Sequence, residues 1–331
     1  MSDLRMIMAG AVSVCLFGSG VLCLPAAGRD VKLVLHPQKA PAEVGEFSLL
    51  PPESAMIDGD AVPLYEKAAK ALPDKAEDDQ IRNWLDVPID QLPLDQVEQA
   101  LSKRMESLKC VAKAVKCRQC NWPETPDLSV YRRLAFVVRL WARLEIANDG
   151  YEGAILALQT GFGMARHLGQ TPTIVQGLVA TAVGAFMCEE VEELVQREGA
   201  PNLCVAMAGL PIPFVQMDKA IENERASASS QGMMDVQMNA GIERARVIVK
   251  RLHNNLAALQ CAEAIRLYAA SHAGKLPRAL ADMTEVSIPA NPVGDGPFHY
   301  SLTGSTAVLE SALSAGADEK ERIRYEISIK N

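Results

Sequence analysis

The stretch TPTIVQGLVATAVGAFMCEEVEELVQRE, residues 171–198, predicts the central helix of the fold. Its middle, from Ile174 to Cys188, carries no charged side chain, so the helix offers no polar face to water along this length. About 15 residues are too few to cross a bilayer, which takes about 20. We therefore expect this helix to be buried in the core of the protein.

Four glutamates follow this apolar stretch, at positions 189, 190, 192 and 193. A hydrolytic site built on paired acids needs two carboxylates that converge, one of them shielded from water. A run of acids this dense on one helix is more typical of a face in contact with solvent. The sequence therefore predicts that these four side chains are exposed.

Helical patterns continue on both sides of the central helix. Residues 128–149 and 151–169 predict a helix pair broken at an Asp-Gly step, and apolar side chains recur three or four residues apart over 93–117. Together these patterns predict a mainly α fold in which residues 58–274 form an antiparallel helical-hairpin body.

The last third of the chain changes character along its length. A long helical segment is expected over 215–271, with a kink at 227–232 where Ser and Gly weaken the helix. Residues 275–331 contain the short β-rich runs PFHYSLTG, TAVLESAL and RIRYEISI, which are joined by Gly-containing turns. They predict a small C-terminal antiparallel meander of two or three strands.

The first 28 residues have the layout of a secretory signal. The run from Met6 to Leu24 has no charge, Arg5 precedes it, and small residues up to Gly28 offer a cleavage site. At 1.5 Å per residue the run would span about 28 Å, so an uncleaved membrane anchor is the main alternative to a cleaved signal, and a buried core helix is a third interpretation. The signal and the anchor both predict an exported protein, either periplasmic or attached to the cytoplasmic membrane and facing outward.

Residues 29–57 hold four prolines and show no sustained periodicity, which predicts a Pro-rich linker.

The chain of 331 residues carries 33 basic and 41 acidic side chains, a net charge of −8. That balance argues against nucleic acid as a partner, because phosphate binding needs a basic footprint. The signatures of zincins, α/β-hydrolases and phosphate-binding loops are absent from the sequence, so we predict no catalytic, cofactor-binding or metal-binding residues.

Two segments resemble tetratricopeptide repeats. In residues 61–73, Ala61, Tyr65, Ala68 and Pro73 follow the spacing of the second helix of such a repeat. Residues 138–168 are similar to a whole helix pair, with small residues where one helix packs on the other. The resemblance implies an array of antiparallel helix hairpins that offers an extended surface to a protein partner.

The segment 262–319 resembles the globular head of type II secretion pseudopilins. The matching runs are AIRLYAASHAGKLPRALADM, IPANPVGDGPFHYSLTG and SAGADEKE, and the resemblance implies a long helix followed by a β-hairpin head. The chain departs from that family at residues 1–28, which lack the pilin start, and at Glu319, where the family has a glycine. The whole body also resembles uncharacterised exported bacterial helical proteins, a likeness that implies export and no particular chemistry.

Three cysteines lie close together in the sequence, at positions 110, 117 and 120. In an oxidising compartment they are disulfide candidates, either Cys117 with Cys120 or one of these with Cys110. Free thiols are the alternative. A zinc site needs further ligands, and a reactive thiolate is disfavoured because we expect Cys117 at the C-terminus of a helix.

These observations favour a non-enzymatic scaffold or protein-interaction protein of the cell envelope. The alternatives are an exported hydrolase-like enzyme whose site is assembled from distant residues, and a secretion accessory with a pseudopilin-like head.

The basic stretch 243–251 has two interpretations, charge pairing along a helix and binding to a membrane surface.

Overall fold

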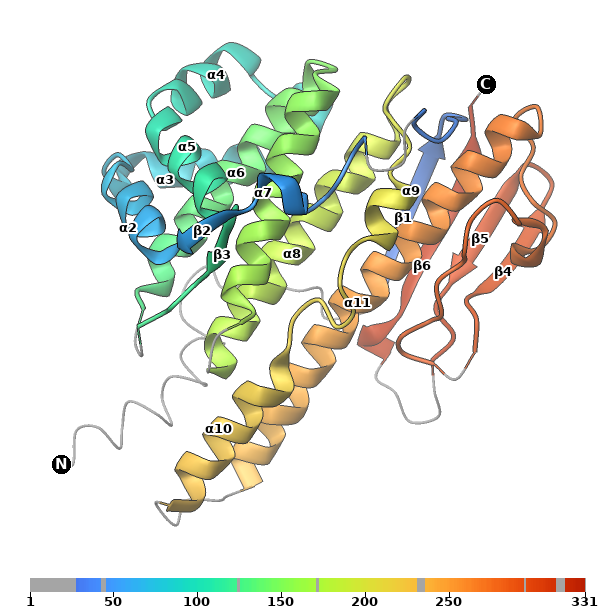
Figure 1. The fold of residues 1–331 in the computed structure, drawn as a ribbon. Helices are drawn as coiled ribbons and strands as arrows, with labels where there is room; N and C mark the ends of the chain where they lie inside the picture. Colours follow the sequence, from blue (N-terminus) through green and yellow to red (C-terminus); the bar gives the residue numbers. More distant parts are fainter. Residues whose placement is uncertain are drawn as a thin grey trace.

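The computed structural model describes residues 28–42, 46–123, 126–170, 173–230, 236–294, 296–313 and 319–330. The predicted signal or anchor lies outside these residues, apart from Gly28. Figure 1 shows a body of helices on one side and a β-sheet on the other, with the long helix α11 (Val236–Ser271) between them. The mainly helical fold with a small C-terminal sheet is confirmed.

Three successive helices form the centre of the body: α6 (Leu128–Ala147), α7 (Tyr151–Leu168) and α8 (Ile174–Val195). The predicted helix pair broken after Asp149 is therefore confirmed. Among the described residues, α8 is the one helix long and apolar enough to cross a membrane, but 72% of its apolar window is buried inside the protein. Its predicted place in the core is confirmed.

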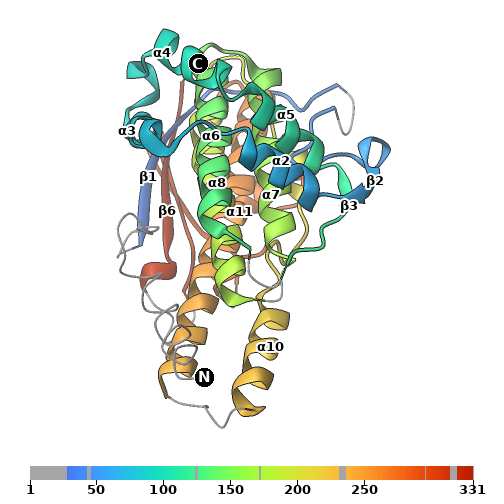
Figure 2. The same cartoon turned by 90° about the vertical axis from the view of Figure 1, so that its left-hand side faces the viewer.

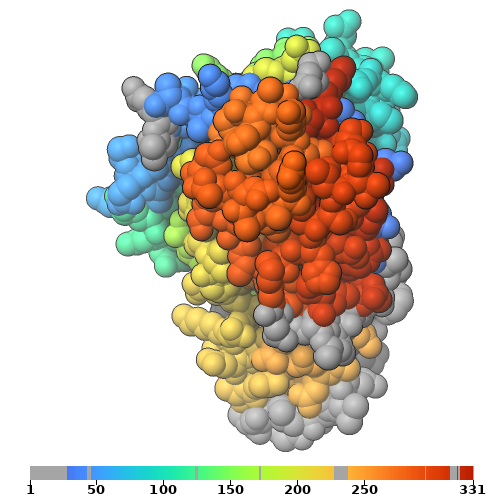
Figure 3. Space-filling view, turned by 90° about the vertical axis from the view of Figure 1, so that its right-hand side faces the viewer, coloured from blue at the N-terminus to red at the C-terminus, as the bar shows by residue number. Residues whose placement is uncertain are grey.

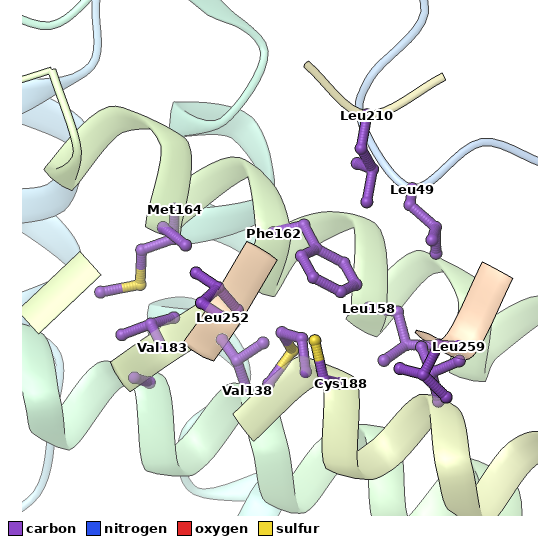
Figure 4. Close-up of a cluster of buried hydrophobic side chains, with 14 of the residues drawn as sticks. Leu49, Val138, Leu158, Phe162, Met164, Val183, Cys188, Leu210, Leu252 and Leu259 are labelled. Carbon is purple, nitrogen blue, oxygen red and sulfur yellow. The ribbon is translucent and has the colours of Figure 1, made fainter. Parts of the chain in front are cut away.

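Close approach of α7 to α8 explains the small residues in these helices. A Cβ atom on Gly161 would lie 2.0 Å from the sulfur of Met187, so a larger residue there would have to displace the Met187 side chain from the interface. Figure 4 shows Phe162 and Met164 of α7 converging on the same core with Cys188 of α8 and residues of α11. The core is thus continuous from the three central helices to the long one.

Shorter elements cover the other side of α6 and α7. They are η1 (Glu53–Ala55), β2 (Ile57–Asp60), α2 (Val62–Lys70), η2 (Lys75–Glu77), α3 (Asp78–Asp86), η3 (Ile89–Gln91), α4 (Leu94–Ser102), α5 (Met105–Ala114) and β3 (Cys117–Gln119). β2 and β3 pair in parallel as a two-stranded sheet, which the sequence did not predict.

The single helix predicted over 93–117 is two helices, α4 and α5. The buried guanidinium of Arg104 lies at the junction, where it donates to the carbonyl oxygen of Ala100 at 2.7 Å and to Glu77 at 2.9 Å. The sequence has no Gly or Pro between α4 and α5 that would predict a break. The break is stabilised instead by the hydrogen bonds of Arg104 to Ala100 and Glu77.

The segment expected to be one kinked helix is also two helices. After α9 (Cys204–Ala208), α10 (Met217–Ser230) runs outward and α11 returns beside it, and the residues between them, 231–235, lie outside the described part of the chain. Figures 1 and 2 show that α10 and the first part of α11 extend as a hairpin beyond the rest of the body. Figure 3 shows the same hairpin extending below the C-terminal region.

The sheet contains four strands in the order β1-β6-β5-β4. β4 (His299–Thr303), β5 (Thr306–Glu310) and β6 (Ile323–Ile329) form the predicted antiparallel meander, preceded by the short η4 (Leu280–Asp282) and with η5 (Glu319–Glu321) before β6. Ile323, Tyr325 and Ile327 alternate inward along β6, so α11 covers one face of the sheet.

The fourth strand corrects the predicted linker. β1 (Arg29–Leu35) lies in the Pro-rich segment 29–57 and pairs in parallel with β6 along its whole length, from Arg29 opposite Ile323 to Leu35 opposite Ile329. Leu33 and Leu35 are fully buried, and they belong to an alternation within RDVKLVL that is typical of a strand. The start of the described chain is therefore part of the C-terminal sheet.

Candidate functional site

A polar cavity of about 200 Å³ lies where the segment before β2 meets β3 and the end of α7. Its polar lining residues are Glu53, Cys117, Arg118, Arg166, His167 and Gln170. A Cβ atom on Gly163 would lie 2.7 Å from Cβ of Val115, so glycine allows α7 to approach the end of α5 at this wall. Arg118 pairs with Glu53 and lies 3.3 Å from Asp58, so the positive charge of the lining comes from Arg166.

His167 lies at the buried end of this cavity. Its Nδ1 is 3.0 Å from the hydroxyl of Tyr65, and its ring also makes a hydrogen bond with the backbone of Cys117. Burial lowers the pKa of His167 to about 4. The imidazole is therefore neutral at pH 7 and engaged on both nitrogens, an arrangement that suits a structural role better than a general base.

The low pKa of His167 predicts a loss of stability in acid. The unfolded chain binds a proton on this ring below about pH 6.5, whereas the folded protein binds it only below about pH 4, so the free energy of unfolding falls between these values by up to about 3 kcal/mol. We expect His167→Gln to remove this part of the pH dependence, measured by urea unfolding at about pH 7 and about pH 4.5. His272→Gln, at an exposed histidine, is the control and should leave the dependence intact.

Aromatic side chains hold the wall behind His167. The ring of Tyr65 stacks on Trp122 with centroids 5.5 Å apart and meets Tyr131 edge-on, and Trp122 donates its indole N–H to the carbonyl oxygen of His167 at 2.9 Å. Tyr65 belongs to α2 and Trp122 to the turn after β3. The cluster therefore joins three separate parts of the chain around the cavity.

Of the three cysteines predicted as disulfide candidates, Cys117 lines this cavity, and all three are unbonded, as are the other cysteines among the described residues. Cys110 lies on α5, Cys117 is the first residue of β3 and Cys120 follows that strand. Cys117 is thus not at a helix C-terminus as expected, because α5 ends at Ala114. Burial raises the pKa of all three thiols, which disfavours a reactive thiolate for a reason other than the helix dipole.

A disulfide between Cys117 and Cys120, or from one of them to Cys110, stays a prediction. It predicts that alkylation of the denatured protein without reductant leaves two of these three cysteines unmodified, as measured by peptide mass spectrometry. Alkylation of all three would make the prediction wrong and would leave packing as their role.

The prediction that the four glutamates at the end of α8 are exposed is wrong for two of them, which are buried. Glu190 is fully buried and accepts from Nε of Arg139 at 2.7 Å, and Nη1 of Arg143 lies 3.4 Å away. Arg139 also pairs with Glu189 at 2.7 Å. Both arginines belong to α6, so these carboxylates join α8 to its neighbour.

Glu192, the second buried carboxylate, joins α8 to the sheet. Both of its oxygens accept hydrogen bonds from the guanidinium of Arg29, and Tyr325 of β6 donates its hydroxyl to Oε1 at 2.7 Å. The same hydroxyl lies 3.1 Å from Oδ1 of Asn255 on α11. Burial raises the pKa of Glu192, and the facing guanidinium of Arg29 opposes that shift. Arg29, the first residue of β1, is therefore held both by the pairing of β1 with β6 and by its ion pair with Glu192.

A third buried ion pair lies on α11. Arg266 and Glu263 are both fully buried and 3.2 Å apart. Arg266 also donates to the carbonyl oxygens of Ala200, Pro201 and His36, and Glu263 accepts from the backbone N–H of Leu203. The pair therefore secures the end of β1 and the segment before α9 to the long helix.

Comparison with known proteins adds no family to these observations. No family model matches the chain, and comparison with curated proteins and with solved structures finds no match. Within the described ranges, no group of three or more His, Cys, Asp or Glu side chains is placed to hold a metal ion. The resemblances to tetratricopeptide repeats and to pseudopilin heads stay predictions.

Proposed function

We propose that this chain is an exported, membrane-attached scaffold of the cell envelope, which binds a protein partner and catalyses no reaction. The main observation behind the proposal is that Arg29, the first residue of β1, is held in place by the sheet and by Glu192. This residue comes five positions after Leu24, the end of the uncharged run, yet it is already paired with β6 and held by Glu192. A membrane segment retained at residues 6–24 would thus hold the folded body through a short connection.

The partners of the buried charged side chains support a structural role for these residues rather than a catalytic one. The ion pairs of Glu190 and Glu192 join separate elements of the fold, and the pair of Glu263 with Arg266 within α11 also bonds to the backbone before α9, so all three have structural roles. The tetratricopeptide resemblance implies that a protein partner would bind along an extended helical surface. A scaffold needs this rigidity, because partners that bind it must be held in a constant geometry.

Two measurements on native envelopes test the proposal. The intact mass of the mature protein and its resistance to alkaline extraction show whether residues 1–28 are retained in the membrane. Affinity purification from detergent-solubilised envelopes, with quantitative mass spectrometry, should then recover one partner at a constant ratio to the chain. A retained chain that purifies alone would contradict the scaffold, and a secretion defect in a deletion strain would favour the secretion accessory instead.

The polar cavity favours a second candidate function, the binding of a small anion. Arg118 and Arg166 line it, and a volume of about 200 Å³ suits a small carboxylate or a phosphate. We expect Arg166→Ala to weaken binding of malonate or inorganic phosphate about tenfold, measured by isothermal titration calorimetry. Arg278→Ala, at an exposed arginine of the C-terminal region, is the control. Absence of any binding to the unsubstituted protein would exclude this candidate.

A further inference from the structure

We propose that the start of α11, within the α10–α11 hairpin, contacts the surface of the membrane that holds the N-terminal segment, and that it binds anionic lipid headgroups there. This inference rests on the proposed membrane attachment and adds an orientation and a lipid-binding surface to it. Its evidence is the register between α11 and the sheet, the length of chain before β1, and the charge on the first part of α11.

Hydrogen bonds fix how α11 lies along the sheet. Asn254 donates to the carbonyl oxygen of Glu321 at 2.7 Å, two residues before the position where Ile323 pairs with Arg29. At the other end, Arg266 donates to the carbonyl oxygen of His36, just after β1 ends. The helix and the strand therefore run in the same direction, with Asn254 level with the start of β1.

The part of α11 before Asn254 consequently extends past the start of the sheet. It begins at Val236, so at 1.5 Å per residue it is about 27 Å long. α10 accompanies it, and Glu224 of α10 accepts from the backbone N–H of Ile174, the first residue of α8. Figures 1 and 2 show both helices continuing beyond the end of the body at this point.

The membrane segment leaves the chain at the same end. From Leu24 to Arg29 the backbone spans at most about 18 Å when fully extended. The start of β1 can therefore be no farther than this from the membrane surface, whereas the hairpin extends about 27 Å from that level in the direction opposite to the strand. A hairpin longer than the connection therefore reaches the membrane when it points toward the surface.

The charge of this part of α11 suits an anionic surface. Residues 236–251 carry four basic side chains and one acidic, in a chain whose net charge is −8. Arg244 and Lys250 are exposed, and Arg246 pairs with Glu243 at 2.9 Å on the same exposed part of the helix. Basic residues near an anionic leaflet contribute about 1 kcal/mol each to binding. On α10, which lies beside this part of α11, the acids Asp218 and Glu222 are also exposed.

Photo-crosslinking of the full chain in lipid nanodiscs tests the proposal. p-Benzoylphenylalanine is placed at Ala240, which is exposed on the first part of α11, and in a second protein at Lys275, which is exposed beyond its other end. The nanodiscs contain phosphatidylcholine alone or with phosphatidylglycerol, and lipid adducts are counted by mass spectrometry. We expect about tenfold more adducts at position 240 than at 275, and more with phosphatidylglycerol than without.

Charge variants sharpen the test. The double substitution Arg244→Glu and Lys250→Glu should reduce the adducts at position 240 to the level found without anionic lipid. Lys275→Glu with Arg278→Glu makes the same charge change at the far end of α11 and should have no effect. A chain that stays in the nanodisc without adducts at 240 would overturn this inference and leave membrane attachment intact. A chain cut after Gly28 and lost from the nanodisc would overturn both.

Discussion

Replacing Glu263 by alanine is expected to lower the free energy of unfolding by about 3–5 kcal/mol, the largest effect of any single substitution considered for this chain. Arg266 would keep its charge in a site with no exposed surface, and its remaining acceptors would be carbonyl oxygens. The backbone N–H of Leu203 would also lose its acceptor. Urea unfolding followed by far-ultraviolet circular dichroism measures the change.

The same helix offers a matched control, because Glu243 and Arg246 form a second pair with the same three-residue spacing on α11. Both side chains of that pair are at least one-third exposed, so Glu243→Ala should cost about 0.5 kcal/mol or less. Glu263→Gln keeps the shape and one acceptor, and it provides a folded variant if alanine is not tolerated. Equal losses for the substitutions at 243 and 263 would contradict the argument from burial.

Local sequence patterns predicted most of the helices and the meander, because their signals lie within a few residues of each other. The apolar run from Ile174 to Cys188 is sufficient to place α8 in the core. Tyr65 was marked by the spacing of the tetratricopeptide resemblance, and it does lie in the aromatic wall of the cavity. The remaining members of that wall come from other segments, and one sequence does not show that they meet.

Non-local contacts account for the predictions that were wrong. β1 exists because Arg29 to Leu35 pair with a strand almost 300 residues later, and a Pro-rich composition hid the alternation of its apolar residues. The glutamates of α8 look like a solvated face until the arginines of α6 and β1 are placed opposite them. A hydrophobic pattern cannot predict burial of a charged residue when its partner is distant in the sequence.

Two of the three buried ion pairs join different elements, and the third, within α11, also holds the backbone of a neighbouring segment. A buried carboxylate is tolerated only when its charge is paired and its oxygens accept hydrogen bonds. The pairs of Glu190 and Glu192 can therefore form only when α6 and β1 meet α8 in one geometry. The additional hydrogen bond of Glu263 to Leu203 forms only when the segment before α9 meets α11. We infer that these pairs specify the arrangement of the helical body and the sheet more than they add to its stability.

Replacing Glu190 by alanine is expected to have the second-largest effect, a loss of about 3–4 kcal/mol in the free energy of unfolding. The carboxylate is fully buried between two arginines of α6, and its removal takes away the carboxylate within salt-bridge distance of Arg143 and leaves the more distant Glu193 facing that guanidinium. Arg139 would keep Glu189 and its position 4.9 Å above the ring of Phe186. Most of the cost therefore comes from Arg143.

Glu189 provides the control for that substitution, since it pairs with the same Arg139 from the next position on α8. Its side chain is 38% exposed, and Arg139 would stay paired with Glu190 in its absence, so Glu189→Ala should cost about 1 kcal/mol or less. Replacing both Arg143 and Glu190 by apolar residues of similar size, as in Arg143→Met with Glu190→Leu, should recover much of the loss, because no unpaired charge is then left buried. If that double variant is no more stable than Glu190→Ala, the cost lies in packing rather than in the unpaired charge of Arg143.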